Sequence, residues 1–165
     1  MTILIVGASG ATGHQLVKQL LKRTLKIRIV VRNPDKLADD IKGHDNILVI
    51  QASILDLSDE KIVELVNGCD VVMSCLGHNI NLKGIFGKPR MLVADATHRL
   101  CKAIKANYPK RPVKFVLMNT TGNSNRDIPE RLSLPEKCVM SIIRLLLPPQ
   151  RDNEKAAEYL RTEIG

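Results

Sequence analysis

The sequence has few aromatic residues, which weakens the case for one kind of nucleic-acid-binding surface. Its 165 residues include two Tyr, two Phe and no Trp. Proteins that bind single-stranded nucleic acid stack bases on aromatic side chains, and this chain offers few of them. Acidic residues are also scarce: 17 Asp and Glu against 25 Lys and Arg give a formal charge of +8. This charge raises the expectation of an anionic partner, but nucleic-acid binding by charge alone ranks last among the functions considered.

Long apolar runs and paired cysteines are also missing. No run approaches the roughly 20 apolar residues of a membrane span, and the first six residues lack the features of a signal peptide. The four cysteines form no C-x-x-C pair, which argues against a zinc knuckle or a disulfide framework. We therefore predict one soluble, cytoplasmic domain over residues 1–165, without a metal site. Its reduced thiols are expected in or near the core.

Five short apolar runs rich in β-branched residues predict β-strands. Near-continuous apolar runs are typical of strands that are buried on both faces of a parallel sheet. The segments between them have the spacing of amphipathic helices, and two further helices follow the last strand. The predicted strands are 3–6, 27–31, 47–50, 71–75 and 114–118, and the later helices are 34–40, 58–66, 93–107, 136–147 and 151–163. This order predicts an α/β fold: a Rossmann-like, doubly wound parallel sheet with helices on both faces.

A glycine motif, G-x-x-G-x-x-G over residues 7–13, follows the first strand and opens the first helix. Gly7 permits a tight turn, Gly10 lets the backbone approach a pyrophosphate, and Gly13 lets the helix pack close to the sheet. The helix N-terminus then presents unpaired N–H groups and a positive dipole end to the phosphates. A glycine-rich turn without a ligand is the alternative, but the strand-loop-helix context favours dinucleotide binding.

The residue after the second strand is Arg32, at the position where a dinucleotide-binding domain selects its cofactor. An acid there would bind the ribose 2′-hydroxyl of NAD, whereas Arg can form paired hydrogen bonds with the 2′-phosphate of NADP. Lys36 adds a second charge, and Ser9 can donate a hydroxyl. We predict NADP as the cofactor, and solvated surface charges at Arg32 and Lys36 are the alternative.

These motifs resemble the atypical short-chain dehydrogenase/reductase-like NAD(P)H-binding family, the NmrA-like group that includes biliverdin-IXβ and flavin reductases. The likeness spans nearly the whole chain and rests on segments 6–13, 30–37, 68–77 and 114–121. It implies that the glycine loop wraps the pyrophosphate, that two cations bind the 2′-phosphate, and that later loops flank the adenine and the cofactor ribose. The cofactor-binding residues so implied are Gly7, Ser9, Gly10, Ala11, Thr12, Gly13, Arg32, Lys36, Ser53, Ile54, Cys75, Leu76 and Gly77.

The catalytic candidates lie after the fourth and fifth strands. The resemblance implies that Thr120 lies beside the nicotinamide, with Thr121 as its neighbour. His78 is a candidate acid or substrate-binding residue, because ligands of doubly wound sheets bind at the carboxyl ends of the strands. The alternatives are a loop histidine without a role and simple turn chemistry in residues 119–121. The polar stretch 119–126 is the segment that we expect to be mobile or functional.

The chain departs from typical short-chain dehydrogenases in one motif. Their Tyr-x-x-x-Lys pair is absent, since Pro112 stands four residues after Tyr108 and Glu163 four residues after Tyr159. We therefore predict an NADPH-dependent reductase that transfers hydride to a flavin, quinone or similar conjugated small molecule, which can take its proton from water. The alternative is a non-catalytic, NmrA-like redox-sensing regulator that binds NADP(H) and a protein partner. Relatives usually continue into another strand and a small substrate lobe, which we expect to be absent or abbreviated here.

Overall fold

The computed structural model describes residues 1–79, 81–120 and 133–164. They form two compact units. The first unit comprises Met1–Gly77 and Ala96–Met118, and the second comprises His78–Asp95 and Asn119–Gly165.

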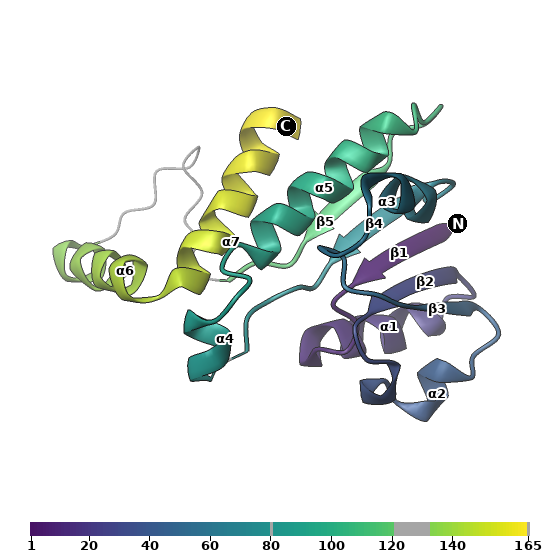
Figure 1. The fold of residues 1–165 in the computed structure, drawn as a ribbon, viewed down its shortest axis with the longest axis horizontal. Helices are drawn as coiled ribbons and strands as arrows, with labels where there is room; N and C mark the ends of the chain where they lie inside the picture. The colour runs from purple at the N-terminus through teal and green to yellow at the C-terminus, as the bar shows by residue number, and fades with distance from the viewer. Residues whose placement is uncertain (80, 121–132, 165) are drawn as a thin grey trace. The chain divides into compact units, whose positions relative to one another are not determined.

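The first unit is built on a five-stranded parallel sheet (Figure 1). Its strands are β1 (Thr2–Val6), β2 (Lys26–Val31), β3 (Ile47–Gln51), β4 (Val71–Ser74) and β5 (Lys114–Leu117). Their order in the sheet is β3-β2-β1-β4-β5. All five predicted strands are confirmed, with ends that differ by a single residue. The central strands are almost wholly buried because their β-branched side chains pack on both faces.

Helices cover both faces of this sheet, as predicted. On one face α1 (Ala11–Leu21) and α2 (Asp39–Lys42) pack against alternate residues of β1 and β2. On the other face α3 (Asp59–Val66) and α5 (Leu92–Ala106) pack against the intervening residues. The fully buried side chains of the two clusters include Ile3, Ile5, Val17, Ile29 and Ile41 on the first face and Leu4, Ile62, Val72 and Leu100 on the second. Burial of each such side chain stabilises the fold by about 1.5–3 kcal/mol.

Local signals set the ends of the connecting helices. Ser58 caps α3, because its Oγ accepts a hydrogen bond from the Lys61 N–H at 3.3 Å. The single helix predicted over residues 34–40 is wrong. A 3-10 turn at Pro34–Lys36 is followed by extended backbone at Leu37 and then by α2. The physical reason is burial, since the Leu37 side chain enters the core beside Ile41.

The second unit contains helices α4 (Leu82–Phe86), α6 (Leu134–Leu146) and α7 (Pro148–Tyr159), and a π-helical turn at Leu160–Ile164 ends it. Both predicted C-terminal helices are present, although each begins two or three residues early. No helix within the described ranges is long and apolar enough to span a membrane. All four cysteines are free thiols. Cys138 on α6 is exposed, so its predicted place near the core is wrong.

Candidate functional site

The strand order places a topological switch point between β1 and β4. From β1 the chain runs outward to β2 and β3, and it then returns to β4 on the other side of β1. The loops that leave the carboxyl ends of β1 and β4 therefore diverge, which is where open α/β sheets bind their ligands. The Cys75 N–H donates to the Val6 carbonyl oxygen at 2.9 Å, so the segment after β4 continues beside the end of β1.

The glycines after β1 are required by close backbone contacts. Gly7 has φ +81°, and a Cβ there would lie 2.5 Å from the carbonyl carbon of Cys75. A Cβ at Gly13 would collide with the Gly7 carbonyl oxygen and lie 2.8 Å from the Cα of Ala8. Gly10 differs, since a Cβ there would meet only the Gly7 oxygen at 3.4 Å. Helix α1 thus begins in contact with the glycine loop that precedes it. At Gly10 the same loop has open space beside the backbone.

The N-terminus of α1 is uncapped. Its N-cap residue is Gly10, no side chain accepts a capping hydrogen bond, and the first turn contains no acidic residue. The residues that form this end are exposed: Ser9, Gly10, Ala11 and Thr12. The first N–H groups of a helix have no partner within the helix, and they carry the positive end of its dipole. This end of α1 can therefore hold an anion such as a pyrophosphate.

Two cations follow β2. Arg32 and Lys36 are both exposed. Neither side chain has a hydrogen bond or an ion pair within the described part of the chain. A short turn brings Lys36 back toward the strand end, because the Asn33 side-chain oxygen accepts from the Asp35 N–H at 2.8 Å. The strand end therefore presents two unneutralised positive charges, as a phosphate site requires.

The loop after β3 is held by a residue that the sequence analysis missed. Ser53 is half-buried and Ile54 is buried, and both precede α3. The guanidinium of Arg99, on α5, donates to the carbonyl oxygens of Ile54 at 3.0 Å, Leu55 at 2.9 Å and Leu57. No local pattern marks this arginine, since its partners lie more than 40 residues away. Arg99 fixes the backbone of the loop that carries Ser53 and Ile54.

The acidic residue Asp59 completes this set of contacts, which we call the Arg99 clamp. The Asp59 carboxylate accepts hydrogen bonds from Arg99 and Lys102, each at 3.0 Å. These bonds, first that from Lys102 and then that from Arg99, hold the pKa of the Asp59 carboxyl below its usual range. Asp59 therefore stays ionised and holds the Arg99 guanidinium beside the loop.

The segment after β4 offers backbone groups rather than charge. Cys75 and Leu76 are half-buried, and Gly77 is exposed with no atom within 4 Å of the position that a Cβ would take. Burial raises the pKa of the Cys75 thiol above its ordinary value. A protonated thiol is a weaker nucleophile than a thiolate.

The catalytic candidates belong to the second unit. His78 Nε2 lies 2.7 Å from Asp152 Oδ2, and Nδ1 lies 3.2 Å from the Gly84 carbonyl oxygen. The His78 side chain is only 6% exposed and that of Asp152 is fully buried. Thr120 is exposed, with Oγ1 3.5 Å from Gln150 Oε1. Thr121 lies outside the described residues. Both ring nitrogens of His78 are therefore engaged within its own unit.

Asp152 has a further role that the sequence analysis did not find. Its two carboxylate oxygens accept from the N–H groups of Val93 and Ala94, each at 2.8 Å, at the start of α5. A buried carboxylate at a helix N-terminus satisfies orphan donors and complements the helix dipole. Among the residues that the structure describes, no three His, Cys, Asp or Glu side chains are grouped to hold a metal ion.

Comparison with known proteins matches most of the chain to a nucleotide-binding family. Residues 7–163 match the family described as NAD(P)H-binding. The match begins at the first glycine of the loop and ends near the last residue described. A comparison of the sequence with curated proteins finds no significant match.

Solved structures share the fold. An oxidoreductase of Lactococcus lactis, ylbE, has a TM-score of 0.70 at 18% identity, over 99% of this chain and 64% of that one. A short-chain dehydrogenase/reductase of Veillonella parvula in complex with NADP has a TM-score of 0.68 at 18% identity, over 98% and 64%. A Streptococcus pneumoniae protein proposed to be an NADH-flavin reductase has a TM-score of 0.63 at 17% identity, over 98% and 66%. The chain thus spans slightly less than two thirds of the length of these neighbours.

Proposed function

Because the chain belongs to the NAD(P)H-binding family, we propose that it is an NADPH-dependent reductase that passes hydride to a flavin, quinone or similar conjugated small molecule. The observation that carries the proposal is the uncapped N-terminus of α1 next to a glycine loop, with the cations Arg32 and Lys36 after β2, neither of which has a partner among the residues that the structure describes. An anion site and two free cations are what a dinucleotide with a 2′-phosphate needs. The Veillonella neighbour, solved with NADP, supports this choice.

The residues of the first unit fit such a cofactor. The N–H groups at the start of α1 would bind the pyrophosphate, and Arg32 with Lys36 would bind the 2′-phosphate. The loop clamped by Arg99 would flank the adenine with Ser53 and Ile54, and the segment 75–77 would border the ribose. Bound NADPH would supply the hydride. The chain supplies binding groups, and the absence of a side chain at Gly10 leaves room for the phosphates.

The acceptor class follows from the proton chemistry of the chain. The sequence lacks the Tyr-x-x-x-Lys pair, and both ring nitrogens of His78 are engaged by Asp152 and Gly84. A conjugated acceptor such as a flavin or quinone stabilises the added electron pair in its own ring system and takes its proton from water. The Streptococcus neighbour, proposed to be an NADH-flavin reductase, supports this acceptor class. We propose Thr120 and Thr121 as the polar residues closest to the nicotinamide.

The decisive experiment is a fluorescence titration with NADPH and NADH. Replacement of Arg32 by Ala removes the paired hydrogen bonds to the 2′-phosphate, so we expect NADPH to bind at least tenfold more weakly, with little change for NADH. Arg23→Ala, at an exposed position past the end of α1, removes the same charge elsewhere and serves as the control. Equal affinity for the two nucleotides, or no binding of either, would contradict the proposal.

The second candidate is a redox-sensing regulator that binds NADP(H) and a protein partner without turnover. It is favoured by the engagement of His78 and by the missing Tyr-Lys pair. Steady-state oxidation of NADPH with FMN, FAD and a soluble quinone separates the two candidates. Turnover that Arg32→Ala slows would support the reductase, whereas tight NADPH binding without turnover would support the regulator.

A further inference from the structure

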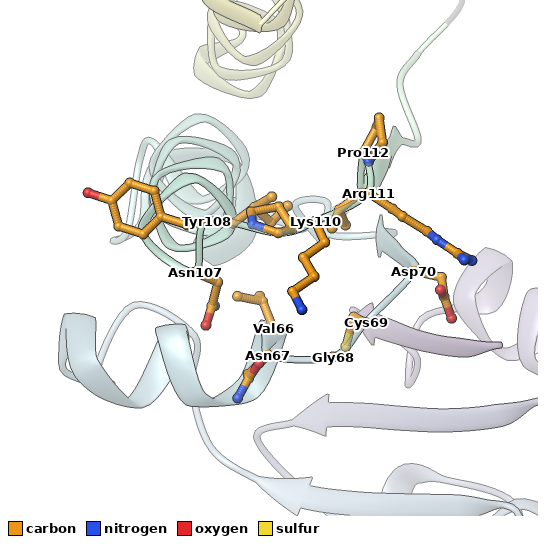
Figure 2. A pocket seen from close by; sticks show the side chains of 13 residues that line it. Val66, Asn67, Gly68, Cys69, Asp70, Asn107, Tyr108, Lys110, Arg111 and Pro112 are labelled. Atoms are coloured by element: carbon orange, nitrogen blue, oxygen red, sulfur yellow. The ribbon is translucent and has the colours of Figure 1, made fainter.

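A pocket lies at the other end of the strands from the glycine loop. It has a volume of about 360 Å³ and is lined by the connection from α3 to β4 and by that from α5 to β5 (Figure 2). Both connections lead into the amino ends of their strands, whereas the glycine loop follows a carboxyl end. All its lining residues belong to the first unit. The volume is at the lower end of the range of small-molecule sites, about 300–1,000 Å³.

The charged residues that line this pocket are two cations and one acid. Lys110 and Arg111 are exposed, and neither side chain has an ion pair or hydrogen bond within the described part of the chain. Figure 2 shows the Lys110 side chain reaching toward Asn67 and Cys69. The acidic lining residue is Asp70, whose Oδ2 already accepts from the Thr2 N–H at 2.7 Å. Two cations and one carboxylate thus leave the lining of the pocket with a small net positive charge.

Apolar side chains form the inner walls. Val66 is buried on α3, and Ile104 and Val113 pack partly buried against the same core cluster. Apolar walls with a few convergent polar groups are the usual composition of a small-molecule site. The combination selects a ligand that has both an apolar body and a negative charge.

One residue at the rim of the pocket, Tyr108, has an unfavourable backbone conformation. Tyr108 follows α5 with φ +45°, in the left-handed region that bulky residues avoid, and its side chain is 88% exposed. Glycine or asparagine would be the ordinary choice at this helix end. Asn107 ties the end of α5 to α3, because its Nδ2 donates to the Val63 carbonyl oxygen at 2.8 Å. Strained residues that the surrounding structure fixes cluster at ligand sites.

Two prolines restrict the rest of the rim. Pro109 and Pro112 stand on either side of the Lys110-Arg111 pair. Since proline fixes its own φ and limits the residue before it, the pair is carried on a short segment with little freedom. Less conformational entropy is then lost when a bound ligand orders this segment.

We propose that this pocket is a second binding site, for a small anion with an apolar body such as an aromatic phosphate ester or carboxylate. Lys110 binds the anionic group, Arg111 adds positive charge at the rim, and Val66, Ile104 and Val113 contact the body. The site is separate from the dinucleotide site, because the two lie at opposite ends of the strands. Its ligand is therefore an effector rather than the hydride acceptor.

The test is a titration of the ¹⁵N-labelled protein with phenyl phosphate, followed by amide chemical shifts with and without saturating NADPH. We expect saturable shifts at residues 67–70 and 110–111 in both arms. Phenol, which lacks the charge, should bind at least tenfold more weakly. Shifts confined to residues 7–13 that NADPH abolishes would instead show binding at the dinucleotide site and overturn the proposal. An absence of saturable shifts would overturn it as well.

A matched pair of variants assigns the cations. Lys110→Gln/Arg111→Gln should weaken phenyl phosphate binding at least tenfold and leave NADPH affinity unchanged. Lys22→Gln/Arg23→Gln removes the same two charges from an exposed Lys-Arg pair elsewhere on the first unit and should have no such effect. Equal weakening in both variants would show a general effect of net charge and would overturn the site. The arm without NADPH tests the pocket even if the proposed reductase function fails.

Discussion

Gly10 and Gly13 lie three residues apart, yet they should respond differently to the same substitution. Gly13→Ala places a methyl group against the backbone of Gly7 and Ala8, so we expect a loss of about 1–3 kcal/mol of stability or more. Gly10 has φ −78° and ψ 162°, which any residue can adopt, and a methyl group there meets only ordinary contact. Gly10→Ala should therefore change stability by less than about 0.5 kcal/mol.

The cofactor distinguishes these two glycines further. The methyl group of Gly10→Ala would stand on the open side of the loop, where the pyrophosphate must approach the backbone. We expect NADPH affinity to fall at least tenfold in a protein that unfolds in urea at the wild-type midpoint. Wild-type NADPH affinity in Gly10→Ala would count against this loop as the phosphate site.

At the scale of elements, Arg99 connects α5 to the loop that would flank the adenine. Arg99→Met removes charged donors from three carbonyl oxygens, so we expect a loss of about 1.5–3 kcal/mol of stability and weaker NADPH binding. Lys102→Met removes the other cation bound to Asp59 without touching the loop, and it is the matched control. Thermal unfolding and NADPH titration measure both effects. If Arg99→Met is destabilised but binds NADPH normally, the clamp serves the fold alone.

Asp152 joins α7 to the start of α5 inside the second unit. Asp152→Asn removes the carboxylate that accepts from two backbone N–H groups and turns an amide N–H₂ toward them, so we expect a loss of about 1.5–3 kcal/mol. Asp95→Asn, an exposed acid in the first turn of the same helix, should cost only about 0.3–1 kcal/mol through the helix dipole. Urea unfolding compares the two. Similar small losses of stability in both variants would mean that the buried Asp152 carboxylate contributes little to stability.

The elements differ in how far the sequence could predict them. The strands were predictable because each is one apolar run, and the glycine loop was predictable because its function depends on local backbone geometry. The break at Leu37 was missed, since it comes from burial against the core rather than from a local breaker. The contacts of Arg99 and of the His78–Asp152 pair join residues more than 40 positions apart. No periodicity or spacing records such contacts, so only the structure could show them.

At the scale of the whole molecule, global stability should depend on pH through a buried thiol. Burial raises the pKa of Cys101 from 9.0 to about 11. Above pH 9 the unfolded thiol ionises while the folded one stays protonated, so the unfolded state holds fewer protons and stability falls as pH rises. The fall from this group steepens toward about 1.4 kcal/mol per pH unit and levels off above about pH 11.

Replacement of Cys101 by Ala isolates this contribution from the other groups that titrate in the same range. We expect the urea midpoint of Cys101→Ala to fall less steeply between pH 9 and 11 than that of the wild type, whatever the offset caused by the lost side chain. Cys69 and Cys75, whose pKa values burial also raises, remain in the variant, so a part of the slope should persist. Cys138→Ala removes an exposed thiol and should retain the wild-type slope. Parallel profiles for Cys101→Ala and the wild type would mean that the Cys101 thiol ionises equally easily in both states, which its burial on α5 argues against.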